Sequence, residues 1–132
     1  MAVKALLTDE AAGAEALAVF NDIRTKRNTD YVNNFWRALA HDEGQLKAVW
    51  DRLQVVMAPG ALDPLVKEMI YIAVSVANNC SYCVHSHSAS AKAKGMTEAQ
   101  YAELLAVIGM ASQTNALATA LQVEVDDRFK VT

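Results

Sequence analysis

Two cysteines and one histidine have the types and spacing of a thiol redox centre. The chain contains only two cysteines, Cys80 and Cys83, and His87 follows four positions after the second. If the segment from Cys80 is helical, these three side chains fall within about 60° of one another, because each residue turns an α-helix by ~100°. His87 then lies one turn beyond Cys83, where it can exchange a proton with that thiol.

The position of the cysteines at the start of a helix favours their reactive form. Both would lie in the first turn, where unpaired backbone N–H groups and the helix dipole stabilise an anion. The thiolate, and not the thiol, is the nucleophile in redox chemistry. His87 is one turn from Cys83 but two turns from Cys80. Cys83 is therefore predicted to be the better activated thiol.

Glu68 is predicted to complete a proton relay. The pair Asn78-Asn79 indicates a turn, so the flanking helices should run antiparallel. Glu68 would then lie about 15 Å below the turn on one arm and His87 about 11 Å below it on the other. At these similar depths they can meet directly or through a water. A carboxylate on so apolar a helix needs a partner, and a structural salt bridge is the alternative to a relay.

Other readings of the cysteines remain open. The two thiols could simply fill an apolar core. Cys80, Cys83, His85 and His87 could also bind zinc, although a helix would point His85 away from the other three. Haem attachment requires a histidine directly after the second cysteine, and this chain has Val84 there. We expect neither a metal nor a bound cofactor.

The elements that must position these residues are all expected to be helices. The segment 65–77 alternates like a strand at Ile70, Ile72 and Val74, but Asp63-Pro64 is a helix start signal and no partner strand is apparent. Because this segment is apolar nearly all round, we expect a central, buried helix. The predicted fold is an all-α, single-domain bundle of six to eight helices, with Cys80-x-x-Cys83 at the N-terminus of a central helix. The expected helices are about 9–24, 31–40, 43–57, 64–77, 80–94, 97–112 and 115–122.

Composition restricts the partners. The 132 residues suit one domain spanning 1–132, and a hydrophobic content of 53% suggests a buried subunit interface. The net charge of −3 includes no basic run, so neither a nucleic acid nor an anionic membrane surface is an expected partner. The longest apolar run, 69–77, is far shorter than the ~20 residues of a membrane span. With no signal-peptide pattern near the start, we expect a cytoplasmic protein.

The spacing of the candidate residues is similar to that of a known family. Glu68, eleven intervening residues, Cys80-x-x-Cys83 and then His87 resembles the alkylhydroperoxidase-D (AhpD-like) / carboxymuconolactone decarboxylase family, from about residue 63 to 121. The resemblance implies an AhpD-like fold, assembly into trimers or hexamers, and reduction of hydroperoxides by the cysteine pair. It also implies re-reduction by a dithiol donor such as a lipoyl-bearing protein.

The same resemblance implies a role for each residue. Cys83 would be the peroxidatic thiol and Cys80 the resolving thiol, with Glu68 and His87 as the proton relay. The peroxidase relatives carry a histidine immediately before the second cysteine, whereas this chain has Tyr82, whose hydroxyl exchanges protons less readily at neutral pH. Two alternatives stay open: a decarboxylase acting on a lactone acid from aromatic breakdown, and a redox-sensing oligomer without turnover.

Overall fold

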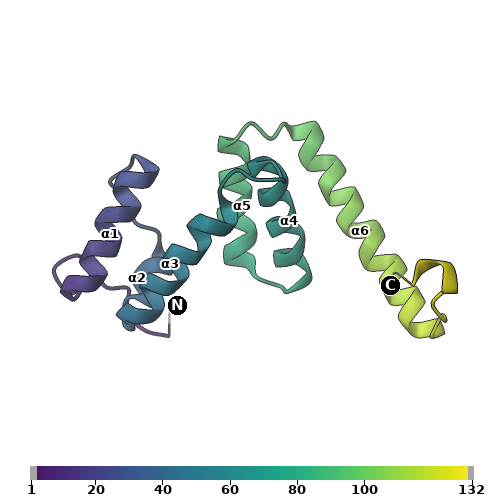
Figure 1. The fold of residues 1–132 in the computed structure, drawn as a ribbon, viewed down its shortest axis with the longest axis horizontal. Coiled ribbons are helices and arrows are strands. Elements are labelled where there is room, and N and C mark those ends of the chain that lie inside the picture. The colour runs from purple at the N-terminus through teal and green to yellow at the C-terminus, as the bar shows by residue number, and fades with distance from the viewer. Residues whose placement is uncertain (1–2, 131–132) are drawn as a thin grey trace. The chain divides into compact units, whose positions relative to one another are not determined.

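A computed structural model describes residues 3–130, and within them it contains helices and no strand (Figure 1). The prediction of an all-α fold with six to eight helices is confirmed. The elements are α1 (Ala14–Arg27), α2 (Asn34–Leu39), α3 (Glu43–Met57), α4 (Pro64–Ala77), α5 (Ser81–Ala93), α6 (Glu98–Leu121) and a 3-10 helix, η1 (Asp127–Phe129). They divide into two compact units that meet in sequence at Ala58 and Pro59. The single domain expected for 1–132 stays a prediction.

The first unit packs α1, α2 and α3 around aromatic side chains. Phe20 of α1 is fully buried, and Trp36 of α2 packs edge-to-face on Trp50 of α3 with ring centroids 5.3 Å apart. The indole N–H of Trp50 donates to a carboxylate oxygen of Asp22 at 2.7 Å, so its polar end is satisfied. These tryptophans are core residues.

The second unit places α4 and α5 side by side around the turn at Asn78 and Asn79 (Figure 1). Asp63 caps α4 by accepting a hydrogen bond from the backbone N–H of Leu65 at 2.8 Å, and Pro64 occupies the first helical position. The helix therefore begins where the sequence predicts, and the segment 65–77 is a helix and not a strand. Ile72 of α4 forms the centre of a small core with two other buried residues, Ala91 and Met96.

The expectation that α4 is buried all round is wrong. Glu68, Ile72 and Ser75 are its buried residues, while Val66, Ile70 and Val74 are between 40% and 52% exposed. The three exposed residues are spaced four apart and therefore share one face of the helix. In the single chain, α5 covers the face with Glu68 and leaves the opposite apolar face uncovered.

The bounds of α1 and α2 differ from the predicted ones for local reasons. Thr8 does not cap a helix from residue 9; its hydroxyl and carbonyl oxygens close a turn by accepting from Ala11 and Ala12 N–H, and α1 begins after Gly13. It continues to Arg27, where Asn28 in the left-handed conformation ends it. Because Asn33 is the cap, α2 also begins three residues later than expected.

One continuous helix, α6, replaces the two predicted over 97–112 and 115–122. The capping box of Thr97 and Gln100 starts it as expected. The polar stretch after Ser112 does not break it, and the Thr114 hydroxyl binds the carbonyl of Met110 within the same helix. By length and composition alone, α6 could cross a membrane, and none of its residues is buried.

Candidate active site

The two cysteines lie at the start of α5 and are joined by a disulfide. Their Cα atoms are 5.3 Å apart, and both residues are partly buried. Cys80 is the N-cap of α5, and its Sγ accepts a hydrogen bond from the backbone N–H of Cys83 at 3.3 Å. The helix N-terminus therefore faces the sulfur atoms, as the sequence predicts, and favours negative charge on them after reduction.

Glu68 and His87 are in direct contact. Oε2 of Glu68, on α4, lies 2.7 Å from Nδ1 of His87, on α5, and only 4% of Glu68 is exposed. The antiparallel arrangement expected from the Asn78-Asn79 turn thus brings the pair together without an intervening water. A carboxylate can only accept hydrogen bonds, so Nδ1–H donates and Nε2 is left as the basic nitrogen of the neutral ring.

The ring of His87 is further held by Tyr71. The two rings are stacked, with centroids 3.6 Å apart and planes inclined by 20°. Tyr71 lies on α4, one turn after Glu68, so a single helix provides both the carboxylate and the stacking ring. These two contacts fix the orientation of the imidazole one turn beyond Cys83.

Two residues that the sequence analysis missed bind the other carboxylate oxygen. Oε1 of Glu68 accepts from the Ser90 hydroxyl at 2.8 Å and from Nζ of Lys94 at 3.0 Å. A signal for them existed in the sequence. Five residues of this segment follow one another at alternating intervals of three and four, which places their side chains on one face of α5: positions 80, 83, 87, 90 and 94.

The charge of Glu68 is set by these partners. Burial alone would raise the pKa of its carboxyl group, but hydrogen bonds from His87, Lys94 and Ser90 outweigh burial and lower this pKa to about 2. Glu68 is therefore ionised throughout the physiological pH range, and it can orient His87 only as an acceptor.

This lowered pKa leads to an expected loss of stability in acid. A carboxyl group whose pKa falls from 4.5 to about 2 on folding stabilises the fold above pH 4.5, and that stabilisation disappears as the pH falls towards 2. For Glu68 the loss is roughly 3 kcal/mol of unfolding free energy. Denaturant unfolding of the wild type and Glu68→Gln should show a difference that shrinks by this amount between pH 6 and pH 2. An equal difference at both pH values would contradict the expectation.

The remaining histidine of α5 lies apart from this cluster. His85 is exposed, as its position on the helix predicts. Within residues 3–130, no group of three or more His, Cys, Asp or Glu side chains is arranged to hold a metal ion. Tyr82, beside the disulfide, is 44% exposed.

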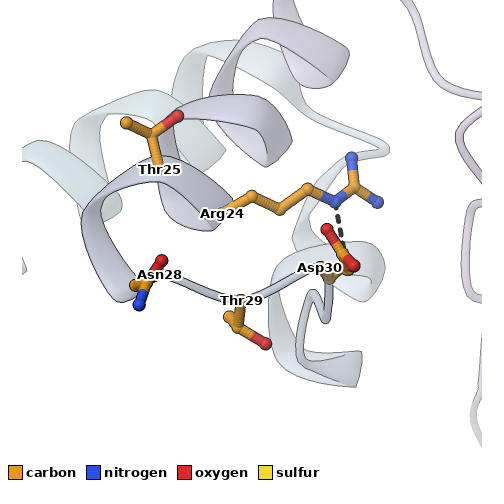
Figure 2. Close-up of a pocket in the computed structure, with 5 residues that line it drawn as sticks. All are labelled: Arg24, Thr25, Asn28, Thr29 and Asp30. Atoms are coloured by element: carbon orange, nitrogen blue, oxygen red, sulfur yellow. Dashed lines mark hydrogen bonds between the residues drawn. The ribbon is translucent and has the colours of Figure 1, made fainter.

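A hollow in the first unit contains none of the predicted site residues. Figure 2 shows it at the C-terminal end of α1. The Arg24 guanidinium that borders it is already bound, to the Asp30 carbonyl at 2.8 Å and to the Asp9 carboxylate at 2.9 Å. We assign no chemistry to this hollow, which is lined by Arg24, Thr25, Asn28, Thr29 and Asp30.

Comparison with known proteins gives three kinds of match: a family model, a solved structure and curated relatives. A model of the carboxymuconolactone decarboxylase family matches residues 44–124, which include every residue of the cluster. A crystal structure of the alkylhydroperoxidase AhpD core from Rhodospirillum rubrum is 57% identical, with a TM-score of 0.95, and the match covers 100% of this chain and 99% of that one.

Two curated relatives match over shorter segments. The alkyl hydroperoxide reductase AhpD of Solibacter usitatus is 40% identical over 75 residues, which are 57% of this chain and 40% of that protein. An uncharacterized protein of the cox locus of Paracoccus denitrificans is 37% identical over 52 residues, or 39% of this chain and 47% of that protein. These alignments thus span less than half the length of either relative.

Proposed function

This chain belongs to the carboxymuconolactone decarboxylase family, and from that premise we propose that it reduces hydroperoxides through Cys80 and Cys83. One observation carries the proposal: a buried, ionised carboxylate contacts His87 one turn beyond Cys83. A histidine held in this way can take the proton of a thiol, and the neighbouring Cys80 can resolve the oxidised product. The likeness to the AhpD proteins supports the same chemistry.

The first step oxidises Cys83. Nε2 of His87 accepts the thiol proton, and the Cys83 thiolate attacks one oxygen of the hydroperoxide. The O–O bond breaks, the sulfur becomes a sulfenic acid, and the departing alkoxide takes the proton from the imidazolium to leave as an alcohol. Glu68 stabilises the imidazolium while it exists and remains ionised.

The second and third steps regenerate the dithiol. The Cys80 thiol attacks the sulfenic sulfur, which forms the disulfide and releases water. An external dithiol then transfers two electrons and two protons by thiol–disulfide exchange, and becomes a disulfide itself. We propose a lipoyl-bearing protein as this donor. A centre that must be re-reduced at every turnover suits the reducing cytoplasm.

A coupled assay tests this function. The purified protein is supplied with an organic hydroperoxide and dihydrolipoamide, and the alcohol and lipoamide produced are both measured. We expect one lipoamide per alcohol. The matched controls are His87→Asn, which should be slow, and His85→Asn, which alters an exposed histidine of the same helix and should leave the rate unchanged. Equal rates for these two variants would contradict the relay.

The name of the family supports a second candidate, the decarboxylation of a lactone acid from aromatic breakdown. The Glu68–His87 pair could serve as a general acid or base for that reaction without any thiol. The double variant Cys80→Ser/Cys83→Ser separates the two candidates, because a decarboxylase would keep its full activity and a peroxidase would lose it.

We further propose that other copies of this chain cover α6 in a trimer or hexamer. Four large apolar residues of α6 are 53% to 73% exposed, and their spacing places them on one face of the helix: Val107, Met110, Leu117 and Leu121. Ser112, Asn115 and Thr119 lie on the opposite face, which does not suit a helix surrounded by lipid. We call these four residues the α6 stripe. Large apolar side chains exposed side by side in this way are typical of a surface that packs on protein.

Charges on this stripe should dissociate the assembly. In Met110→Glu/Leu117→Glu, two carboxylates would have to be buried without partners, so we expect the mass measured by light scattering to fall to that of a monomer. The matched control, Ser112→Glu, adds its charge to the opposite face and should leave the mass unchanged. A wild-type protein that is already monomeric would contradict the proposal.

A further inference from the structure

Lys94 belongs to the cluster around Glu68 but takes no part in the proposed steps. Its Nζ donates to Oε1 of Glu68 at 3.0 Å and to the hydroxyl of Ser90 at 2.8 Å. The Ser90 hydroxyl itself donates to the same Oε1 at 2.8 Å. Three groups thus form a closed set of hydrogen bonds on the side of the carboxylate away from His87. The Lys94 side chain is 39% exposed, so its charge is partly solvated.

Glu68 also influences the charge of the His87 ring. A buried carboxylate at 2.7 Å favours the positively charged imidazolium over the neutral ring. Only the neutral ring can accept the proton of Cys83. A positive charge on the same carboxylate reduces this bias, because it offsets part of the negative potential at the ring.

We propose that Lys94 is a positioning residue that sets the pH at which His87 becomes a base. The ion pair of Lys94 with Oε1 of Glu68 fixes the carboxylate so that its Oε2 meets Nδ1 of His87. The positive charge of Lys94 also opposes protonation of the His87 ring, so the ring stays neutral at a lower pH than it would beside Glu68 alone. This inference rests on the proposed function, since it concerns the proton transfer from Cys83. The lowered pKa of Glu68 agrees with it, because the bond from Lys94 is among the causes.

The other titratable groups around the ring are few. Glu68 and Tyr71 face His87 from α4, and Cys83 and Lys94 lie on the same face of α5. At the start of α6, Glu98 pairs with Lys92 at 3.1 Å and is bound to neither member of the Glu68–His87 pair. Lys94 is thus the cation that the described structure places on Glu68.

The test compares three lysine variants. Lys94→Met should move the acid limb of the pH–rate profile of hydroperoxide reduction to higher pH by about half a unit, since a partly exposed ion pair is being removed. Lys94→Arg keeps the charge and should return the midpoint to within about 0.2 units of the wild type. Lys92→Met removes a lysine two residues away that pairs with Glu98 and should cause no shift.

A second measurement separates this inference from the proposed function. Proton NMR of the disulfide form follows the titration of the His87 ring without any turnover. The midpoint should rise by the same amount in Lys94→Met, even if the protein reduces no hydroperoxide. An unchanged NMR midpoint, or an equal shift in Lys94→Arg, overturns the inference. A lower melting temperature without a midpoint shift overturns it too, because it would assign Lys94 a structural role only.

Discussion

Replacing Cys83 with serine should abolish hydroperoxide reduction, with a fall in rate of at least about a thousand-fold. The serine hydroxyl keeps the shape of the side chain but stays protonated at neutral pH, and it does not form a sulfenic acid. Cys83 lies at the start of α5, one turn before the Glu68–His87 pair, and a serine hydroxyl there gives up its proton to the relay far less readily than a thiol does. Loss of hydroperoxide, measured directly, is the appropriate assay.

The matched control for this variant is Cys80→Ser. In that protein Cys83 remains the attacking thiol, but no second thiol is present to resolve its sulfenic acid. We expect one equivalent of hydroperoxide to be consumed rapidly, followed by arrest. If Cys80→Ser were inert and Cys83→Ser still reacted once, the assigned roles of the two cysteines would have to be exchanged.

The second large effect is expected from Glu68→Gln. An amide can still bind His87, but it no longer stabilises the imidazolium, and Lys94 is left beside a neutral group. A positioned base contributes about 100-fold to 10,000-fold, so the rate of sulfenic acid formation should fall by at least the lower figure. Stopped-flow measurement of the first turnover isolates this step from re-reduction.

Stability must be separated from chemistry in this experiment. Removing one partner of a buried ion pair also weakens the fold by about 3–5 kcal/mol, so rates should be compared at a temperature where circular dichroism shows both proteins folded. The variant Glu98→Gln removes an exposed carboxylate that pairs with Lys92, and serves as the matched control. A first turnover in Glu68→Gln as fast as in Glu98→Gln would contradict the relay.

The parts of the fold with strong local signals could be predicted from the sequence. Asp63-Pro64 starts α4, and the Asn78-Asn79 turn reverses the chain. Because an α-helix has a fixed rise per residue, the turn and the number of residues on either side of it were sufficient to place Glu68 opposite His87. That contact is the part of the site that the sequence determined best.

The missed parts depend on tertiary contacts or on weak local signals. Lys94 and Ser90 look like ordinary surface residues of α5, and only the position of the Glu68 carboxylate shows what they bind. The continuity of α6 was missed because polar residues after Ser112 resemble a break, although their side chains can bond within the helix. The uncovered face of α4 could not be predicted, because the hydrophobic pattern does not distinguish burial within a chain from burial between chains.

The proposed function requires Cys80 and Cys83 to form a working dithiol that reacts with hydroperoxides. The most direct test is a thiol titration of the reduced protein before and after one equivalent of an organic hydroperoxide, repeated with Cys83→Ser. Two thiols should disappear together in the wild type, a dithiol should restore both, and the single thiol of Cys83→Ser should persist. Survival of both wild-type thiols in excess hydroperoxide would contradict the proposed function.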